Sequence, residues 1–324
     1  MKPARRNALS LLALLVATPL AALAQAWPAR PLRIITPFAA GGATDIYARG
    51  VAQQLQVALG QPVVVDNRPG GNFAIGTEAA AKAEPDGHTI FTVTSSHSVL
   101  EALGVNREKY QLMRDFTPIA ALNQTTCVLM IHPQVPANSV RELIALSKAK
   151  PNSLNYASTG NGGMLHLAGE LFKSLSGADL THVPYKIGSN ARVDLISGRV
   201  QVMFDTLTDA AANVRAGKLR ALATCGAKRS PIFPDLPTIA EAGVPGYELP
   251  VLIGTMAPKG TPRAVVERLN SEISRIVMQP ELREAWSKMG AESTVMSADE
   301  LGRALNGEID KWGRLIKSAK ITAD

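Results

Sequence analysis

Short apolar runs rich in β-branched residues alternate with longer stretches of helical periodicity along most of the chain. The apolar runs predict strands over residues 32–38, 62–68, 89–95, 127–133, 153–159, 180–185, 200–206 and 219–227. The periodic stretches predict helices over residues 44–60, 73–83, 139–151, 163–177, 190–198, 261–279, 281–290 and 297–320. This alternation is typical of an α/β fold with parallel sheets.

Two of the predicted helices carry a capping box at their start. Ser139 is followed three residues later by Glu142, and Ser297 is followed in the same way by Glu300. A hydroxyl and a carboxylate at this spacing satisfy free N–H groups at a helix N-terminus. These signals fix the beginning of a helix in the middle of the chain and of another in its last third, which is mostly helical.

The length of the chain favours two domains. About 300 residues, once a leader is removed, exceed what one hydrophobic core usually fills. We expect a discontinuous first domain over residues 27–127 plus 227–324 and a second domain over residues 128–226. The extended runs at 127–133 and 219–227 flank the middle block, and we expect them to be the two segments that cross between the domains.

Residues 1–26 have the features of a secretory signal peptide. A basic start is followed by an apolar stretch and by small residues that suit cleavage near residue 24 or 26. A membrane anchor is the alternative, but the apolar stretch is short for a bilayer and contains Pro19. We therefore predict a protein secreted through the inner membrane into the periplasm.

Charge and aromatic content bear on the kind of partner. Loss of Lys2, Arg5 and Arg6 lowers the formal net charge from +7 to +4. A mild positive balance helps to attract anionic solutes. We expect no nucleic-acid partner, because the chain has no basic run and few aromatic residues to stack on bases.

Cys127 and Cys225 are the two cysteines of the chain. In an oxidising compartment they could form one disulfide, and each falls in one of the two predicted crossing segments. Two buried free thiols are the alternative. Sequence separation does not decide between them.

Motifs of catalysis and of cofactor binding are missing from the sequence. No phosphate-binding loop, nucleophile elbow or paired His/Cys metal motif is present, so we predict neither a cofactor nor a metal site. Ser95, Ser96 and His97 are adjacent and suggest a periplasmic hydrolase as an alternative function. Adjacent side chains point in different directions, however, and we prefer the interpretation of these residues as a polar loop after a strand.

Three glycine-rich turns lead from a predicted strand into a predicted helix. They lie at residues 37–45, 67–76 and 158–167. The N–H groups and the dipole at a helix start favour an anion, and small side chains let it approach the backbone. Ordinary strand-to-helix turns remain the alternative, as helix capping does for Asp45 and Asp205.

Six segments in order resemble the Bug family, the periplasmic solute-binding proteins of tripartite tricarboxylate transporters, close to the TctC type. These segments are 26–49, 63–89, 157–173, 183–205, 217–248 and 257–270. The resemblance implies a type II periplasmic binding protein, or Venus flytrap, with two α/β domains joined by two crossover segments. It also implies a non-catalytic receptor that captures a small organic carboxylate between the domains by backbone amides and ordered water.

The resemblance also implies partners and contact residues. The partner is a membrane permease of large and small subunits, and we expect the receptor to be a monomer. A ligand-presenting partner of a sensor kinase is a further alternative. Carried over onto this sequence, the ligand-binding residues are Phe38, Ala39, Gly41, Gly42, Thr44, Asp45, Gly71, Asn72, Thr94, Ser95, Ser96, Ser158, Thr159, Gly160, Asn161, Gly162, His166, Tyr185 and Asp205.

The sequence departs from the family pattern at two places. Family members often have proline at the position of Ala39 or Ala40, and a glycine directly after the lysine that here is Lys186. In this chain Ile187 stands between that lysine and Gly188. We expect the departure at Ile187 to affect which carboxylate is bound.

Overall fold

The computed structural model describes residues 27–319 and 321, so the predicted signal peptide lies outside the described residues. Within them, ten strands form one mixed sheet in the path β2-β1-β3-β9-β4-β7-β5-β6, and β10 and β8 pair with β4 beside that path. The strands are β1 (Leu32–Thr36), β2 (Val63–Asn67), β3 (Thr89–Thr94), β4 (Phe116–Ile131), β5 (Asn155–Ser158), β6 (Thr181–Pro184), β7 (Val202–Thr206), β8 (Arg220–Thr224), β9 (Pro250–Pro258) and β10 (Ala291–Ser293). The helices are α1 (Ala43–Leu59), α2 (Ala74–Ala81), α3 (Ser95–Ala102), α4 (Leu112–Asp115), α5 (Val140–Ala149), α6 (Met164–Ser176), α7 (Gly188–Ile196), α8 (Leu207–Arg215), α9 (Arg263–Val277), α10 (Pro280–Lys288) and α11 (Ala298–Ala319).

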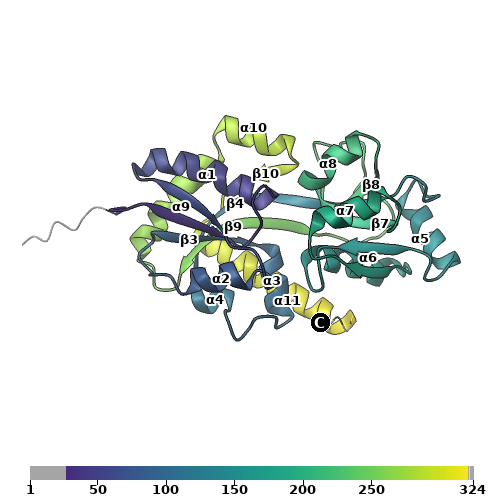
Figure 1. Cartoon of the computed structure of the whole chain (residues 1–324), viewed down its shortest axis with the longest axis horizontal. Helices are drawn as coiled ribbons and strands as arrows, with labels where there is room; N and C mark the ends of the chain where they lie inside the picture. The colour runs from purple at the N-terminus through teal and green to yellow at the C-terminus, as the bar shows by residue number, and fades with distance from the viewer. Residues whose placement is uncertain (1–26, 320, 322–324) are drawn as a thin grey trace, which may run out of the picture.

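The long strand β4 belongs to both halves of the sheet. Its residues 116–126 pair with β9, whereas its residues 127–131 pair with β7. We call sheet A the part made of β2, β1, β3, β9, β10 and residues 116–126 of β4. Sheet B is the part made of β7, β5, β6, β8 and residues 127–131. Figure 1 shows β4 and β9 running between the two halves, with helices flanking each half.

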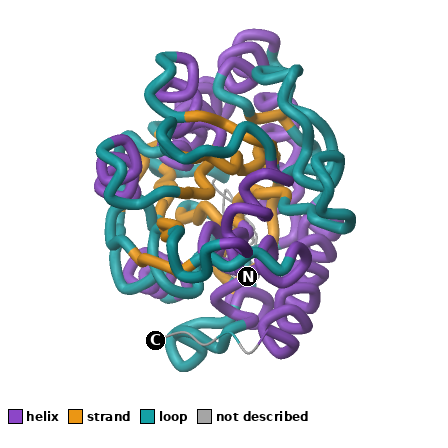
Figure 2. The backbone as a smooth tube through the Cα atoms, turned by 90° about the vertical axis from the view of Figure 1, so that its right-hand side faces the viewer, coloured by secondary structure: helices purple, strands orange, loops and turns teal. Residues whose placement is uncertain are grey.

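Sheet A is covered by helices on both faces. Tyr47 of α1, Ile273 of α9 and Trp286 of α10 are buried in the core on one face. Phe91 of β3 and Leu305 of α11 are buried in the core on the other. Seen from the sheet-B end, the strands lie inside a shell of helices and loops (Figure 2). The predicted α/β fold class is therefore confirmed. None of the described helices is long and apolar enough to cross a membrane.

The second crossing segment differs from the one expected at residues 219–227. β8 stays in sheet B, where it pairs with the end of β4. The chain returns to sheet A later, at Leu249, whose N–H donates to the carbonyl of Cys225 before β9 begins. Between these points, Tyr247 is buried in the sheet-B core. An apolar run predicts a strand but not the sheet that it joins, which explains the error.

The domain boundaries drawn from the sequence stay a prediction. Residues 239–249 supply Ile239, Val244, Tyr247 and Leu249 to the core that lies against sheet B. This packing would place the second boundary after Leu249 rather than at residue 226.

The two cysteines are neighbours on paired strands. The N–H of Cys225 donates to the carbonyl of Cys127 at 2.8 Å, and both side chains are buried. Of the two alternatives that the sequence leaves open, the structure has the free thiols. The adjacent Cys225 thiol and burial raise the pKa of Cys127 well above its ordinary value.

Candidate ligand-binding site

Strand directions bring two sets of loops toward the junction of the sheets. β3 is antiparallel to β9, and β9 is antiparallel to β4, so β3 and its parallel neighbours β1 and β2 run toward sheet B. β7 is antiparallel to β4, so β7, β5 and β6 run toward sheet A. We call the C-terminal ends of β1, β2 and β3, with the loops that follow them, edge A. Edge B consists of the C-terminal ends of β5, β6 and β7, with the loops that follow them.

The strand register gives the spacing of the two edges along β4. Thr94, at the end of β3, is opposite Ile253, which is opposite Asn123 of β4. Thr206, at the end of β7, is opposite Cys127. Four residues of an extended strand span about 13 Å, which is the scale of a small organic molecule. In α/β folds, ligands bind at the carboxyl ends of parallel strands.

Two contacts hold edge A and edge B together beside β4. The hydroxyl of Tyr47, on α1, lies 2.9 Å from Oγ1 of Thr208, on α8. Helices α3 and α6 also contact one another, and Val99 of α3 and Leu165 of α6 belong to the same buried core. Helices that begin at the two edges are therefore packed against one another.

The turn after β1 leads directly into α1. Gly41 has a φ of 79°, in the left-handed region that favours glycine, and Gly42 is the N-cap of α1. Phe38 and Gly42 are partly exposed, Ala39 and Gly41 are exposed, and Thr44 is buried in the first turn. No side chain among the described residues caps α1 at Gly42. The first N–H groups of a helix have no partner within the helix, so they are free to meet an anion.

The side chain of Asp45 stabilises this turn through hydrogen bonds. Its carboxylate accepts hydrogen bonds from the N–H of Gly41, from Nε of Arg49 and from Nδ2 of Asn67, each at 2.9 Å. Burial acts to raise the pKa of Asp45, but these hydrogen bonds together hold the pKa below its ordinary value. Asn67 also donates to the carbonyl of Phe38. Asn67 was not among the predicted site residues, and its only signal in sequence is its place at a strand end.

The turn after β2 is held in an unusual backbone conformation. Gly71, Asn72 and Phe73 have φ values of 60°, 51° and 69°, all in the left-handed region. Nδ2 of Asn106 donates to the carbonyls of Gly71 and Asn72. A non-glycine residue held there costs on the order of 1–3 kcal/mol, and such strain is concentrated at functional sites. Phe73, the N-cap of α2, is a second edge residue that the sequence prediction missed.

The turn after β3 begins α3 with a capping box. Oγ1 of Thr94 accepts from the N–H of Ser96 at 3.3 Å, and Nδ1 of His97 accepts from the N–H of Thr94 at 3.1 Å. Burial lowers the pKa of His97 to about 4, although a hydrogen bond with the Thr94 backbone acts to raise it. His97 is therefore neutral at physiological pH and serves the helix start.

Ser95 is buried and points away from His97. Its hydroxyl donates to Oε1 of Glu308 at 2.6 Å and accepts from the N–H of Leu252 at 2.9 Å. No hydrogen bond joins Ser95 or Ser96 to the His97 ring among those between described residues. The nucleophile–base pair that the hydrolase alternative requires has no support in this geometry.

Edge B contains a compact polar cluster behind the turn after β5. The hydroxyl of Ser158 lies 2.7 Å from Nε2 of His182, and the N–H of Gly162 donates to Nδ1 of His166 at 3.0 Å. The two imidazoles stack with centroids 4.0 Å apart. Burial and the neighbouring His166 lower the pKa of His182 to about 4. His182 was not predicted, because its partners come from a different strand.

Other residues of the turn after β5 are more exposed to solvent than Ser158. Gly160 and Gly162 have φ values of 120° and 71°, which explains the glycines, and Thr159 is exposed. Asn161 is partly exposed between them. The start of α6 thus presents a glycine-rich turn to the junction, as the start of α1 does.

Tyr185 and Ile187 follow β6 at the outer side of edge B. The Tyr185 hydroxyl donates to Oδ2 of Asp194 at 2.8 Å, and its N–H donates to the carbonyl of Ser158. Burial and Asp194 raise the pKa of Tyr185. Ile187 is the N-cap of α7 and is 58 % exposed, which leaves its apolar side chain available for contact.

Asp205 is buried at the end of β7 and is paired with a cation that the sequence prediction missed. Nη1 of Arg192, on α7, lies 2.8 Å from Oδ2 of Asp205 and 3.4 Å from Asp209. Burial raises the pKa of Asp205 to about 6, although Arg192 acts to lower it. The predicted residues therefore all lie at edge A or edge B, but Asp45, Ser95, Ser158 and Asp205 are occupied by internal hydrogen bonds.

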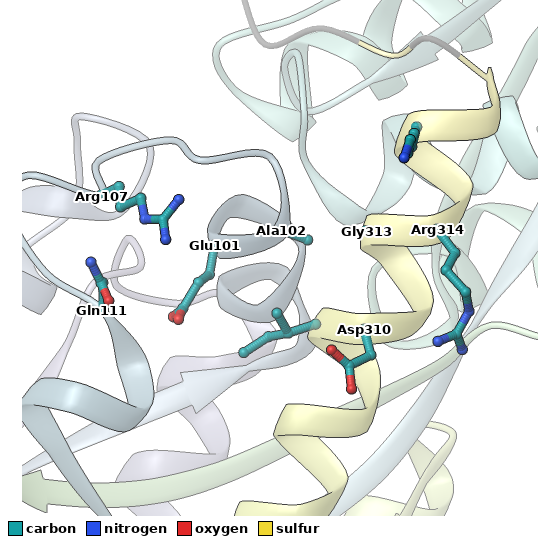
Figure 3. Close-up of a pocket in the computed structure, with 9 residues that line it drawn as sticks. Glu101, Ala102, Arg107, Gln111, Asp310, Gly313 and Arg314 are labelled. Carbon is teal, nitrogen blue, oxygen red and sulfur yellow. The ribbon is translucent and has the colours of Figure 1, made fainter.

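Two further observations concern a groove outside the predicted site and the capacity of the described residues to bind a metal ion. A groove of about 470 Å³ lies between α3 and α11, lined by Glu101, Arg107, Asp310 and Arg314 among others (Figure 3). It contains none of the predicted site residues. The described residues include no group of three or more His, Cys, Asp or Glu side chains that could hold a metal ion.

Comparison with solved structures defines the class of protein. The chain is similar to a Rhodopseudomonas palustris protein, Rpa4515, solved with adipate, at 34% identity and a TM-score of 0.86, covering 92% of this chain and 100% of the other. MatC from the same organism, solved with bound malate, is 30% identical with a TM-score of 0.81, covering 90% and 100% of the two chains. The periplasmic binding protein BugD is 32% identical with a TM-score of 0.82, covering 92% and 100%. The fold is therefore that of a periplasmic binding protein.

Sequence relatives identify the family. Residues 47–321 match the model of the tripartite tricarboxylate transporter family receptor, TctC. BugT of Bordetella pertussis is 35% identical over 295 residues, covering 91% of this chain and 90% of BugT. The chain belongs to the TctC family of solute-binding receptors, which confirms the resemblance inferred from its motifs.

Proposed function

We propose that this receptor captures a small organic carboxylate between edge A and edge B, mainly through backbone N–H groups and ordered water. The observation that carries the proposal is that α1, α3 and α6 all begin at these edges, α3 directly after its strand and α1 and α6 after a glycine-rich turn. The starts of α1 and α6 have no side-chain cap, so their N–H groups favour an anion without a fixed positive side chain, whereas α3 is capped by Thr94 and His97. The adipate and malate found in two similar proteins support this ligand class.

Capture would work by closure of the two halves around the ligand. β4 and β9 are the strands that connect them, so their residues near Cys127 and Leu249 would act as the hinge. A carboxylate that contacts both edges stabilises the closed state, and only this differential contact drives closure. The predicted contacts at residues 38–45, 71–72, 94–96 and 158–162 form the two walls in this proposal.

The receptor would then deliver its ligand to a permease of large and small subunits. The family description supports a transport partner, and the predicted leader supports a periplasmic location. We propose a monomer that catalyses no reaction, because a receptor of this kind releases its ligand unchanged.

A thermal-shift panel on refolded, ligand-free protein tests the proposed capture. Mono-, di- and tricarboxylates are added singly, and binding to the native state raises the midpoint of unfolding. We expect at least one carboxylate to raise it while the corresponding amide does not. If no carboxylate shifts the midpoint, the proposed ligand class is wrong.

The Gly42→Val variant tests the role of the first turn. A side chain at Gly42 would meet only the Ala39 carbonyl, at 3.5 Å, so the fold should persist. It would stand between the ligand and the N–H groups of α1, and we expect affinity to fall at least tenfold by calorimetry. Gly307→Val, in open space on α11, is the matched control and should bind as the wild type. Equal affinity of all three proteins would exclude the turn from the site.

A further inference from the structure

Edge A carries an aromatic cluster assembled from three separate loops. Phe38 follows β1, Phe73 precedes α2, and His97 lies in the first turn of α3. The Phe38 and Phe73 ring centroids are 4.7 Å apart, and the His97 ring is 5.9 Å from Phe38 and 5.3 Å from Phe73. Both phenyl rings are partly exposed, whereas His97 is buried beneath them.

The left-handed backbone conformation of Phe73 indicates that its ring has a functional role. A φ of 69° is adopted readily by glycine and poorly by a residue with a large side chain. The sequence nevertheless places phenylalanine at the fourth of four consecutive positions with positive φ, after Gly70, Gly71 and Asn72. Its ring covers Phe38 and His97 rather than the main core of sheet A. Strain of this kind persists where the side chain serves a site.

His97 adds an unused hydrogen-bond donor to the cluster. Nδ1 lies 3.1 Å from the Thr94 N and 3.3 Å from the Thr94 carbonyl, and we take the shorter contact, in which Nδ1 accepts, to assign the proton of the neutral ring to Nε2. Nε2 is buried and has no hydrogen-bond partner among the described residues. Because the His97 ring is fully buried, this nitrogen does not face the exposed side of the cluster, and His97 contributes its ring as the floor beneath Phe38 and Phe73.

We propose that Phe38, Phe73 and His97 form a specificity subsite for a flat apolar group, so that the preferred ligand is an aromatic carboxylate rather than a short polar di- or tricarboxylate. This inference rests on the proposed capture of a carboxylate at the same edges. Gly41 and Gly42 follow Phe38 within four residues, and Ser95 and Ser96 precede His97. A carboxylate held at the uncapped start of α1 would therefore bring its attached group against the phenyl rings, where aromatic groups pack at such distances.

The test compares benzoate and phenylacetate with malate and succinate on refolded protein, by calorimetry. We expect the aromatic acids to bind at least tenfold more tightly to the wild type. In Phe73→Gly this preference should disappear through weaker aromatic binding, with malate affinity unchanged. Glycine suits a φ of 69° but loses the ring contacts with Phe38 and His97, so thermal unfolding is measured first to show that this variant is folded.

Phe233→Ala is the control, because Phe233 is also partly exposed but packs beside sheet B, with Arg215 over its ring. It should retain the wild-type preference. Equal binding of aromatic and aliphatic acids by the wild type overturns the subsite and leaves carboxylate capture intact. An equal loss of both classes in Phe73→Gly also overturns it. Absence of binding by any carboxylate overturns the proposed function itself.

Discussion

The hydroxyl of Tyr47 and Oγ1 of Thr208 lie 2.9 Å apart and join α1, on the sheet-A side, to α8, on the sheet-B side. Thr208 donates in turn to the carbonyl of Met289, so Tyr47 is the donor to Thr208. Tyr47 is fully buried, with its ring edge-on to Trp286 at 5.2 Å. This contact connects the two halves independently of the strands β4 and β9.

A double-mutant cycle on this pair should show coupling. Tyr47→Phe keeps the ring and removes the donor, and we expect it to lower the free energy of unfolding by about 1 kcal/mol. Thr208→Val should cost more, because the bond to Met289 is lost as well. The two effects should sum to more than the effect of the double variant in urea unfolding. Strict additivity would mean that the hydrogen bond contributes nothing.

Glu308 should make stability depend on pH. Burial raises its pKa to about 7, although the hydroxyls of Ser95 and Ser98 act to lower it, and its Oε2 is buried without a partner among the described residues. The folded protein therefore binds this proton more tightly than the unfolded chain does. The contribution of protonated Glu308 to the free energy of unfolding is fully present below about pH 4.5. It is lost as the pH rises to about 7, and the loss is at most about 3 kcal/mol.

The Glu308→Gln variant isolates that effect. An amide keeps an acceptor for Ser95 but does not ionise, so its stability relative to the wild type should improve steadily between pH 4.5 and 8. Urea unfolding at several pH values measures the difference. A difference that stays constant with pH would show that Glu308 has an ordinary pKa in the folded protein.

Gly169 should tolerate no larger side chain. An added Cβ would overlap the Tyr156 ring, which is buried beside α6. Gly169→Ala should lower the free energy of unfolding by about 1–3 kcal/mol through overpacking. Gly307→Ala, in a helix with open space, should instead raise it by about 0.5–1 kcal/mol. Equal effects of the two variants in thermal unfolding would contradict the packing at Tyr156.

The buried thiols should be inert in the folded, reduced protein. Cys127 and Cys225 are both fully buried, and the pKa of Cys127 is raised. The thiolate is the reactive form, so alkylation at pH 8 should label neither cysteine until urea unfolds the chain, when both are labelled. Mass spectrometry counts the adducts. Rapid labelling of the native protein would show that the strands β4 and β8 separate readily.

Sequence periodicity predicted the long helices well, because their apolar faces are regular. The prediction over 163–177 matches α6 at Met164–Ser176, and that over 44–60 matches α1 at Ala43–Leu59. It missed α3 and α8, which begin immediately after Thr94 and Thr206. A strand that passes into a helix without a turn residue gives no break in the pattern, so the polar residues 95–97 were interpreted as a loop.

The predicted site rests on glycine turns and on family resemblance and stays a prediction, and the residues that support those turns in the structure were not predicted. Asn67, His182 and Arg192 act through partners that are distant in sequence, namely Asp45, Ser158 and Asp205. No local pattern indicates such pairs. Phe73 was missed for a different reason, since its left-handed backbone is a property of the folded turn.

The place of β9 affects the order in which the chain can fold during synthesis. β9 lies between β3 and β4 in sheet A, although more than a hundred residues separate it from either strand along the chain. All the strands of sheet B, by contrast, are complete once β8 has been made. The growing chain therefore exposes the unpaired edges of β3 and β4 until its last third emerges. Such edges are sites of aggregation, so a holding chaperone should be needed most during this interval.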